Sequence, residues 1–290
     1  MPSDKSQSKQ PLAIDCMYYV ATEEFMKQWD KAKEGELLCR MERSIGGLPR
    51  FESIETMLGH MDEAGVEKVF ITQCKMWSYR RKWMYMDTKL EDVLQYTEKH
   101  PSRFVGLAGY NPFEIRQSLR EIETAVCDHG FKGVYVHIYG FDIPLNDAKM
   151  YPLFAKCEEL GVPVSMQVGH VLEAMPSDCA RPMMLDRIAC DFPDLRMLGA
   201  HTGWPWVEEL ISACYKWDNI WFGVDAWLPK YLSPEILQFI NSRMGQDRCV
   251  WGTNGLPWNT NLNQLTDLGL RPEAHRKLIR DNAIELFKLA

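Results

Sequence analysis

Short apolar runs alternate with amphipathic segments along the chain. The apolar runs have the length and the β-branched content of buried strands, and the segments between them carry apolar residues at helical spacing. This alternation predicts repeated βαβ units, a parallel sheet and, with eight runs, one single (β/α)8 TIM barrel of the α/β class. The predicted strands are Leu12 to Cys16, Glu67 to Thr72, Phe104 to Ala108, Gly133 to His137, Pro163 to Gln167, Arg196 to Ala200, Ile220 to Val224 and Cys249 to Gly252.

The helical segments between the strands follow the i, i+3, i+4, i+7 rule, so each apolar stripe should face the sheet. Start and stop signals agree, because Ser233-Pro234-Glu235 suits the first positions of a helix and Gly130 and Gly161 stand where helices should end. The clearest stripes are Ile54, Met57, Leu58 and Met61, and Met150, Leu153, Phe154 and Cys157.

One barrel domain over residues 11–290 is expected, preceded by a polar segment, 1–10, expected to be disordered. Residues 21–51 are the irregularity, because they far exceed the usual βα loop of roughly 2 to 6 residues. This insertion could be a lid over the barrel mouth or a helical excursion packed on the rim. Phe25, Trp29, Leu37 and Leu38 would support either interpretation.

The composition and net charge limit which classes of partner we expect for this protein. The 290 residues are 46% hydrophobic and 25% charged, and the net charge of −7 gives no positive surface for a phosphate backbone, so nucleic acid is not expected as a partner. The polar start is not followed by an uninterrupted apolar run, so we expect no signal peptide, no membrane span and a cytoplasmic protein. The nine cysteines, without a CxxC pair, are interpreted as reduced, buried small hydrophobes.

In a barrel of this type the active site lies where the strands end, because the βα loops converge there on one mouth. Three of the seven histidines follow consecutive predicted strands. Any one of them fits a structural role as well as acid–base chemistry, but three together favour a site. The residues at or just after the strand ends are Cys16, Met17, Tyr19, Trp77, Arg80, Arg81, Tyr110, Asn111, His137, Gln167, His170, His201, Asp225 and Asn254.

Two charged features at these ends have alternative interpretations. Arg80 and Arg81, in the run MWSYRRKW, could hold a carboxylate bidentately, or they could belong to a solvated helix start whose tryptophans pack on the rim. Asp225 is the only carboxylate among the strand-end residues. It could orient a histidine, act as a base, or form a salt bridge with Lys230 or with an internal arginine.

Several segments together resemble the amidohydrolase 2 family, in its branch of aminocarboxymuconate-semialdehyde and resorcylate decarboxylase-like proteins. The similarity extends from Leu12 to the C-terminus, and it rests on the order and spacing of the segments rather than on any one of them. They are LAID, GFKGVYVHIYG with PLND, ELGVPVSMQVGH, LGAHTGWPWVEEL, WLPKYL, WGTNGLPW and DNAIELFKL.

The resemblance implies a metal site, but this chain departs from its pattern. The family's first strand ends in Ile-Asp-x-His-x-His or a variant with Glu, whereas Met17 and Tyr19 occupy the two ligand positions here. Neither side chain is a good ligand for Zn²⁺ or Mn²⁺. Cys16 is a conceivable substitute, but strand alternation would point it to the other face.

The later part of the family pattern is only partly kept. His170 and His201 match its histidines, but its Gly-Thr-Asp-x-Pro motif is matched by a segment with Asn254 in place of the Asp. A neutral amide cannot take a proton from water as that Asp does. We therefore expect no metal and no cofactor, with residual Zn or Mn binding as the exception.

The leading hypothesis is a metal-independent enzyme that acts on a small, often aromatic or unsaturated, carboxylate by hydrolysis, carbon–carbon cleavage or decarboxylation. A ligand-binding barrel without catalysis and a metallohydrolase with an unusual ligand set are the alternatives. The resemblance also implies a homodimer. The predicted catalytic residues are His170, His201, Asp225 and Tyr19, and the predicted substrate-binding residues are Arg80, Arg81, His137, Trp77, Asn254, Met17 and Tyr110.

Overall fold

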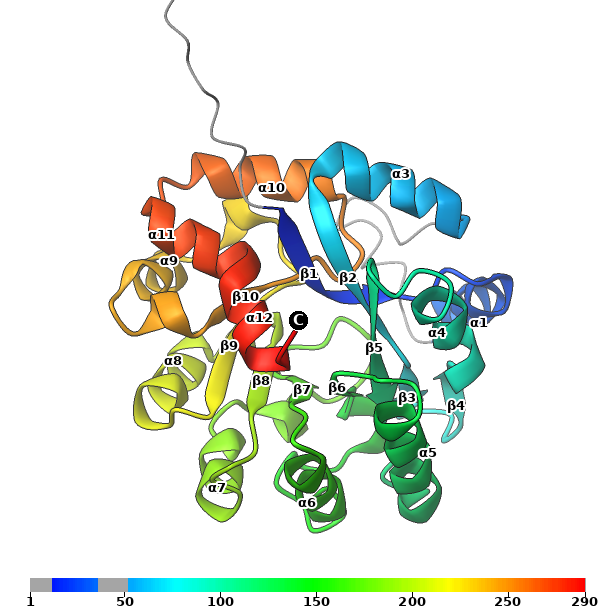
Figure 1. The fold of residues 1–290 in the computed structure, drawn as a ribbon. Coiled ribbons are helices and arrows are strands. Elements are labelled where there is room, and N and C mark those ends of the chain that lie inside the picture. The colour runs from blue at the N-terminus through cyan, green and yellow to red at the C-terminus, as the bar shows by residue number, and fades with distance from the viewer. Residues whose placement is uncertain (1–11, 36–51, 290) are drawn as a thin grey trace, which may run out of the picture.

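A computed structural model describes residues 12–35 and 52–289 and contains the predicted barrel. Eight strands form one parallel sheet in the order of the chain, and helices between them surround it (Figure 1). The α/β barrel class is confirmed. The barrel strands are β1 (Ala13–Tyr19), β2 (Val66–Thr72), β5 (Phe104–Gly109), β6 (Gly133–Val136), β7 (Val164–Gln167), β8 (Met197–Ala200), β9 (Ile220–Val224) and β10 (Cys249–Trp251).

The first strand differs most from its predicted bounds. It runs three residues beyond Cys16, because Tyr18 and Tyr19 pair with Ile71 and Thr72 of β2 across an irregularity in the register. A change in register cannot be read from an apolar pattern alone. The other bounds agree with the prediction to within one residue at each end, and those of β9 agree at both ends.

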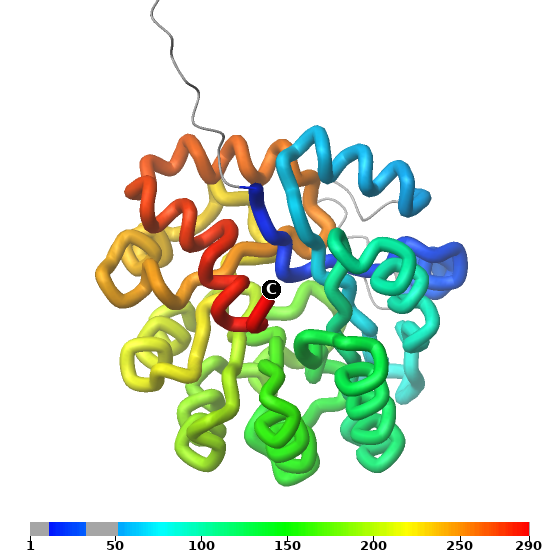
Figure 2. The backbone as a smooth tube through the Cα atoms, viewed as in Figure 1, coloured from blue at the N-terminus to red at the C-terminus, as the bar shows by residue number. Residues whose placement is uncertain are grey.

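The helices form a ring outside the strands, as the backbone trace in Figure 2 shows. Ser53 caps the first turn of α3 with its hydroxyl, and Gly161 ends α6 in the left-handed region at φ 66°. The predicted stripe of α6 is buried. The helices are α1 (Glu23–Gly35), α3 (Ile54–Ala64), α4 (Leu90–Thr97), α5 (Ile115–Cys127), α6 (Tyr151–Leu160), α7 (Met184–Asp191), α8 (Val207–Lys216), α9 (Pro234–Asn241), α10 (Trp258–Asp267), α11 (Pro272–Arg276) and α12 (Asn282–Phe287).

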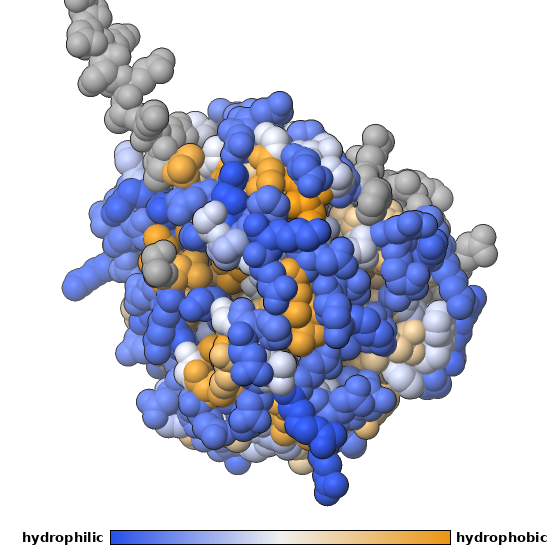
Figure 3. All heavy atoms as spheres, turned by 45° about the vertical axis from the view of Figure 1, so that its right-hand side comes forward, coloured by the Kyte–Doolittle hydropathy of each residue, from blue (hydrophilic) through white to orange (hydrophobic). Residues whose placement is uncertain are grey.

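One end of the barrel is closed by the last helix. α12 crosses it in Figure 1, and the ring of Phe287 lies 4.4 Å from that of Phe70 inside the sheet. Apolar side chains form the buried core. On the face shown in Figure 3 hydrophilic side chains predominate and the apolar patches are small and separate. A site for ligands is therefore left to the other end, where the strands finish.

The barrel is closed between β10 and β1 by side-chain and loop contacts rather than by a regular ladder. The backbone N–H of Asn254 donates to the carbonyl of Met17 at 2.8 Å. Asp15, which is fully buried, accepts hydrogen bonds from the backbone N–H groups of Met17 and Thr253, from the Thr253 hydroxyl and from the Trp258 indole. Burial opposes ionisation and outweighs these donors, so the pKa of Asp15 is raised to about 6.

The described part of the insertion, residues 21–35, packs as a helical excursion. Phe25 and Trp29 of α1 are buried, and the rings of Tyr19, Phe25 and Trp29 stack in sequence with centroids 6.0 Å apart at each step. The remainder of the predicted insertion, with Leu37 and Leu38, lies outside the described residues, and so does the N-terminal segment 1–10.

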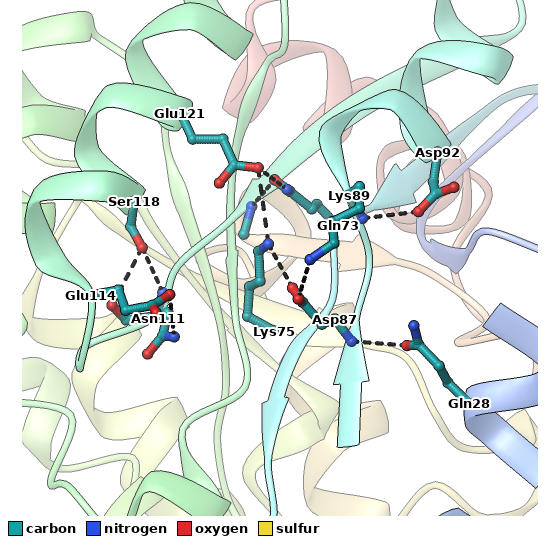
Figure 4. Close-up of polar contacts among 11 residues, drawn as sticks. Gln28, Gln73, Lys75, Asp87, Lys89, Asp92, Asn111, Glu114, Ser118 and Glu121 are labelled. Atoms are coloured by element: carbon teal, nitrogen blue, oxygen red, sulfur yellow. Dashed lines mark hydrogen bonds and ion pairs between the residues drawn. The ribbon is translucent and has the colours of Figure 1, made fainter. Parts of the chain in front are cut away.

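The chain after β2 forms an antiparallel hairpin of β3 (Lys75–Trp77) and β4 (Met84–Asp87), not the helix start considered above. Polar contacts hold it in place (Figure 4). Lys75 lies 2.8 Å from Asp87, and the backbone N–H of Asp87 donates to Gln28 of α1 at 3.0 Å. The hairpin is thus tied to the insertion helix, and its tip carries Arg80 and Arg81.

The cysteine prediction is confirmed for most positions. Every cysteine within the described ranges has a free thiol, but Cys127 and Cys190 are exposed rather than buried because they lie on the outer helices. None of the helices in these ranges is both long and apolar enough to cross a membrane.

Candidate active site

Asp225 holds His201 at two points where β8 and β9 end. Its carboxylate accepts the backbone N–H of His201 at 2.7 Å and lies 2.6 Å from Nδ1 of the ring. Asp225 is almost fully buried, with 3% of its surface exposed. Because an ionised carboxylate only accepts hydrogen bonds, Nδ1 carries a hydrogen and Nε2 is the ring atom available to a bound molecule.

The backbone at His201 is folded unusually. His201, Thr202 and Gly203 have φ values of 68°, 61° and 72°, so three consecutive residues lie in the left-handed region. Only the glycine adopts this conformation without cost. The two hydrogen bonds that Asp225 accepts fix His201, which is therefore held in one orientation by its side chain and by its backbone together.

A cavity of about 300 Å³ lies next to this pair. Its walls are mainly apolar, and Trp204 and Trp227 pack against each other with ring centroids 5.6 Å apart. A cavity of this size, with aromatic walls and few polar groups, suits a small planar molecule. The lining residues are Tyr19, Gln167, His170, Val171, Leu172, Glu173, His201, Trp204, Ala226, Trp227, Leu228, Tyr231 and Asn254.

A chain of hydrogen bonds crosses the barrel at the cavity and joins four strand ends. Tyr19 donates to Oδ1 of Asn254 at 2.5 Å, Gln167 donates to the hydroxyl of Tyr135 at 2.5 Å, and Tyr135 bonds to Tyr19. Burial raises the pKa values of Tyr19 and Tyr135 well above those of exposed tyrosines. Both phenols therefore keep their hydrogens at neutral pH.

The direction of this chain follows from the number of hydrogens in it. Each phenol has one, and because that of Tyr19 goes to Asn254, Tyr135 must donate to Tyr19 and Gln167 must donate to Tyr135. The amide nitrogen of Asn254 is then available to a bound molecule as a donor. The oxygen of Gln167 is available as an acceptor, because both residues line the cavity.

Glu173 brings a carboxylate to the cavity itself, whereas Asp225 lies behind His201. Glu173 lies in the loop after β7, and its Oε1 is 3.7 Å from Nε2 of His137 and 3.4 Å from the hydroxyl of Tyr85. Burial raises its pKa, but the neighbouring imidazole of His137 outweighs burial, so the net pKa of Glu173 lies below its ordinary value.

The predicted site residues fall into two groups. Tyr19, His170, His201 and Asn254 line the cavity, and Asp225 lies directly behind His201. His137 is buried behind Glu173. In this arrangement Asp225 orients a histidine, which is one of the three roles considered for it.

The other five predicted residues do not line this cavity. Met17 is buried next to Gly252, and Trp77 stacks on Phe141 with ring centroids 5.9 Å apart. The hydroxyl of Tyr110 donates to the carbonyl of Lys149 at 2.6 Å. Arg80 and Arg81 are exposed in the turn of the β3–β4 hairpin, because the chain leaves the barrel sheet after β2.

Sequence reasoning selected neither the aromatic wall residues Trp204 and Trp227 nor the polar residues Tyr135 and Glu173. Tyr135 has the same strand parity as His137 and could have been found from it, since alternate residues of a strand share a face. Glu173 gave no such signal, because its inward position depends on the path of the loop after β7.

The donors at the mouth do not fit a tightly held divalent cation. Such an ion needs three or four protein ligands, mainly imidazole, carboxylate or thiolate. Tyr19 and Asn254 bond to each other, and both oxygens of Asp225 are engaged by His201. Within residues 12–35 and 52–289, no three His, Cys, Asp or Glu side chains are arranged to hold a metal ion.

Comparison with known proteins gives one family and several structures. A family model described as amidohydrolase matches residues 80–289. The chain is similar to an uncharacterised TIM-barrel protein from Bordetella bronchiseptica, with a TM-score of 0.78 and 24% identity over 95% of this chain and 98% of that one. At this identity the similarity shows the fold alone.

Two similar structures are decarboxylases with bound manganese. A 5-carboxyvanillate decarboxylase from Novosphingobium aromaticivorans, with manganese and 3-methoxy-4-hydroxy-5-nitrobenzoic acid, has a TM-score of 0.71 and 17% identity over 96% of this chain and 97% of that one. A dihydroxybenzoic acid decarboxylase from Polaromonas, with manganese and the inhibitor 2-nitroresorcinol, has a TM-score of 0.68 and 17% identity over 95% and 96%.

Proposed function

Because this chain belongs to the amidohydrolase family, whose model matches residues 80–289, we propose that it decarboxylates a small aromatic or unsaturated carboxylate. The observation that carries the proposal is the orientation of His201 by Asp225 beside a cavity with aromatic walls. The family resemblance found in the sequence is confirmed. The substrate class and the reaction are our inference.

The reaction needs one well-placed proton. His201, protonated on both ring nitrogens, would donate from Nε2 to the ring carbon that bears the carboxylate, and a carbon–hydrogen bond would form. The carbon–carbon bond would then break, carbon dioxide would leave, and the electron pair of that bond would restore the unsaturated system. Asp225 would stabilise the charged imidazole before transfer and keep it in the same orientation afterwards.

The cavity favours a planar ligand over a long or highly charged one. Trp204 and Trp227 offer faces for stacking, and the amide of Asn254 can donate a hydrogen bond. The residues lining the cavity, as far as the described chain extends, include no arginine or lysine. A substrate carboxylate would therefore lie towards His170 and His201 rather than towards Arg80 and Arg81.

Decarboxylation by His201 also agrees with the poor metal donors at the mouth. Hydrolysis would require an activated water, and the neutral Asn254 stands where the family pattern has a basic Asp. Delivery of a proton from an imidazole requires neither that base nor a cation. We therefore propose that the reaction is independent of manganese and zinc.

The test is release of carbon dioxide from 2,6-dihydroxybenzoate, 5-carboxyvanillate and related aromatic acids. His201→Asn is the informative variant, because asparagine tolerates the left-handed backbone that His201 adopts. We expect turnover of at least one acid, reduced by about 10²- to 10⁴-fold in His201→Asn with ligand binding retained. Unchanged turnover in this variant would contradict the proposal, and binding without any turnover would favour the ligand-binding barrel.

A further inference from the structure

Glu173 is the one ionisable carboxylate among the residues that line the cavity in the described chain, and the mechanism above does not use it. Two hydrogen bonds hold its loop in place. His170 N–H donates to the carbonyl of Trp204 at 2.6 Å, and Val171 N–H donates to the hydroxyl of Ser177, on the other side of Glu173 in the chain, at 3.1 Å. These bonds fix the path of the loop that carries the side chain. Only 9% of the Glu173 side chain is exposed.

His137 is the buried imidazole that faces the carboxylate of Glu173. The imidazole side chain is 1% exposed, and its Nε2 lies 3.7 Å from Oε1 of Glu173, slightly too far for a hydrogen bond in this arrangement. Neither ring nitrogen forms a hydrogen bond elsewhere within the described residues. Among the described residues, Glu173 supplies the carboxylate that lies within 4 Å of His137, so it is the charge best placed to stabilise a protonated ring.

The other groups around Glu173 do not compete for this role. Tyr85 of β4 lies 3.4 Å from the carboxylate, and Tyr139, whose ring is 5.2 Å from that of His137, contributes a buried phenol. Burial raises the pKa of Tyr139 well above its usual value, so it stays neutral. His201 faces the same cavity and favours a negative charge on Glu173.

We propose that Glu173 is a second catalytic residue of this cavity, which accepts the hydrogen of a hydroxyl group on the bound aromatic molecule, and that His137 is its positioning residue. This inference rests on the proposed function for its reaction, but not for its test. The charge of Glu173 also orients the ligand, because the negative carboxylate of a substrate would lie away from Glu173 and towards His201 and His170.

The proton movement balances within the site. As His201 protonates the ring carbon, the oxygen–hydrogen bond of the ligand breaks, its proton bonds to a Glu173 oxygen, and the electron pair left on the ligand oxygen enriches the ring. After carbon dioxide leaves, the proton returns from Glu173 to that oxygen. Glu173 ends unchanged, and the proton that the reaction consumes comes from His201.

The test uses 2-nitroresorcinol as a probe and requires no turnover. Its affinity is measured by titration calorimetry for the wild type and Glu173→Gln at pH 5, where the neutral phenol is favoured, and at pH 8, where the phenolate is favoured. We expect Glu173→Gln to bind about tenfold more weakly at pH 5, where the charged acceptor is lost, and about tenfold more tightly at pH 8, where repulsion is relieved. A change of sign with pH distinguishes charge recognition from a packing defect.

Two further variants separate the roles. Tyr85→Phe removes a nearby hydroxyl without removing the charge, and it should keep the wild-type pH dependence. The same pair of titrations is repeated in the His137→Asn background, by comparing His137→Asn with His137→Asn/Glu173→Gln. The pH at which the effect of Glu173→Gln on affinity changes sign should then rise by about one unit, because burial raises the pKa of Glu173 when the imidazole is absent. The comparison in the His137→Asn background also tests Glu173 if the single variant Glu173→Gln proves unstable.

Equal affinity ratios at pH 5 and pH 8, or no binding of the probe to either protein, would overturn the role of Glu173. An unmoved reversal pH in His137→Asn would overturn the role of His137. Turnover that depends on His201 but not on Glu173 would leave the proposed function standing and remove only this extension.

Discussion

Tyr19 and Asn254 lie 235 positions apart in the chain, yet the phenol of one donates to the amide oxygen of the other at 2.5 Å. The bond joins the end of the first barrel strand to the loop after the last. It lies at the two places where the resemblance to the family implies metal ligands. The pair therefore links closure of the barrel to the chemistry of its mouth.

Tyr19→Phe tests this link. Loss of the hydroxyl leaves the oxygen of Asn254 and the hydrogen of Tyr135 without partners, and we expect unfolding free energy to fall by about 1–3 kcal/mol and probe affinity to fall with it. Tyr110→Phe is the matched control, because its buried hydroxyl bonds to Lys149 away from the cavity. It should lower stability and leave affinity unchanged. Equal effects of the two variants on affinity would argue against a role for the Tyr19 pair.

Asp225→Asn tests the orientation of His201. One of the two acceptor atoms becomes an amide donor, so either the backbone N–H or Nδ1 of His201 loses its partner. We expect kcat to fall by about 10²- to 10⁴-fold with a small change in KM, since the effect acts on proton transfer. Steady-state kinetics with the best substrate of the panel give the answer. A change confined to KM would place Asp225 in binding rather than in catalysis.

Trp204→Ala tests the aromatic wall. Removing this ring takes away one member of the aromatic pair, and we expect affinity for 2-nitroresorcinol to fall by about tenfold, the size of one lost aromatic contact. Tyr215→Ala is the control, because that ring is 50% exposed on an outer helix. Fluorescence quenching during titration measures both. Similar losses in the two variants would show that the ligand does not stack on Trp204.

Asp15 makes stability depend on pH. Its pKa is raised from 3.8 to about 6 by burial, so the folded protein binds this proton more tightly than the unfolded chain between those values. The cost of the buried charge is thus fully present above pH 6 and is relieved as pH falls towards 4. Relative to Asp15→Asn, the wild type should gain on the order of 1 kcal/mol of unfolding free energy between pH 7 and pH 5. Urea denaturation at the two pH values measures it, and a wild-type gain at higher pH would have the wrong sign.

The fold could be predicted from the sequence, but the site only in part. Strand runs and the rule for barrel mouths placed Tyr19, His170, His201 and Asn254 correctly, because these residues follow strands directly. Arg80 and Arg81 were expected at the mouth, but the chain enters an antiparallel hairpin after β2. Glu173 was missed for the same reason, since a loop path depends on tertiary contacts that leave no periodic signal.

The central claim is that His201 transfers its proton without a metal ion. The most direct test is the rate of carbon dioxide release by chelator-treated protein, compared with the same protein supplied with manganese, with metal content measured in both. We predict rates within about twofold of each other and far less than one metal ion per chain after treatment. Activity that appears only with stoichiometric manganese would contradict this claim.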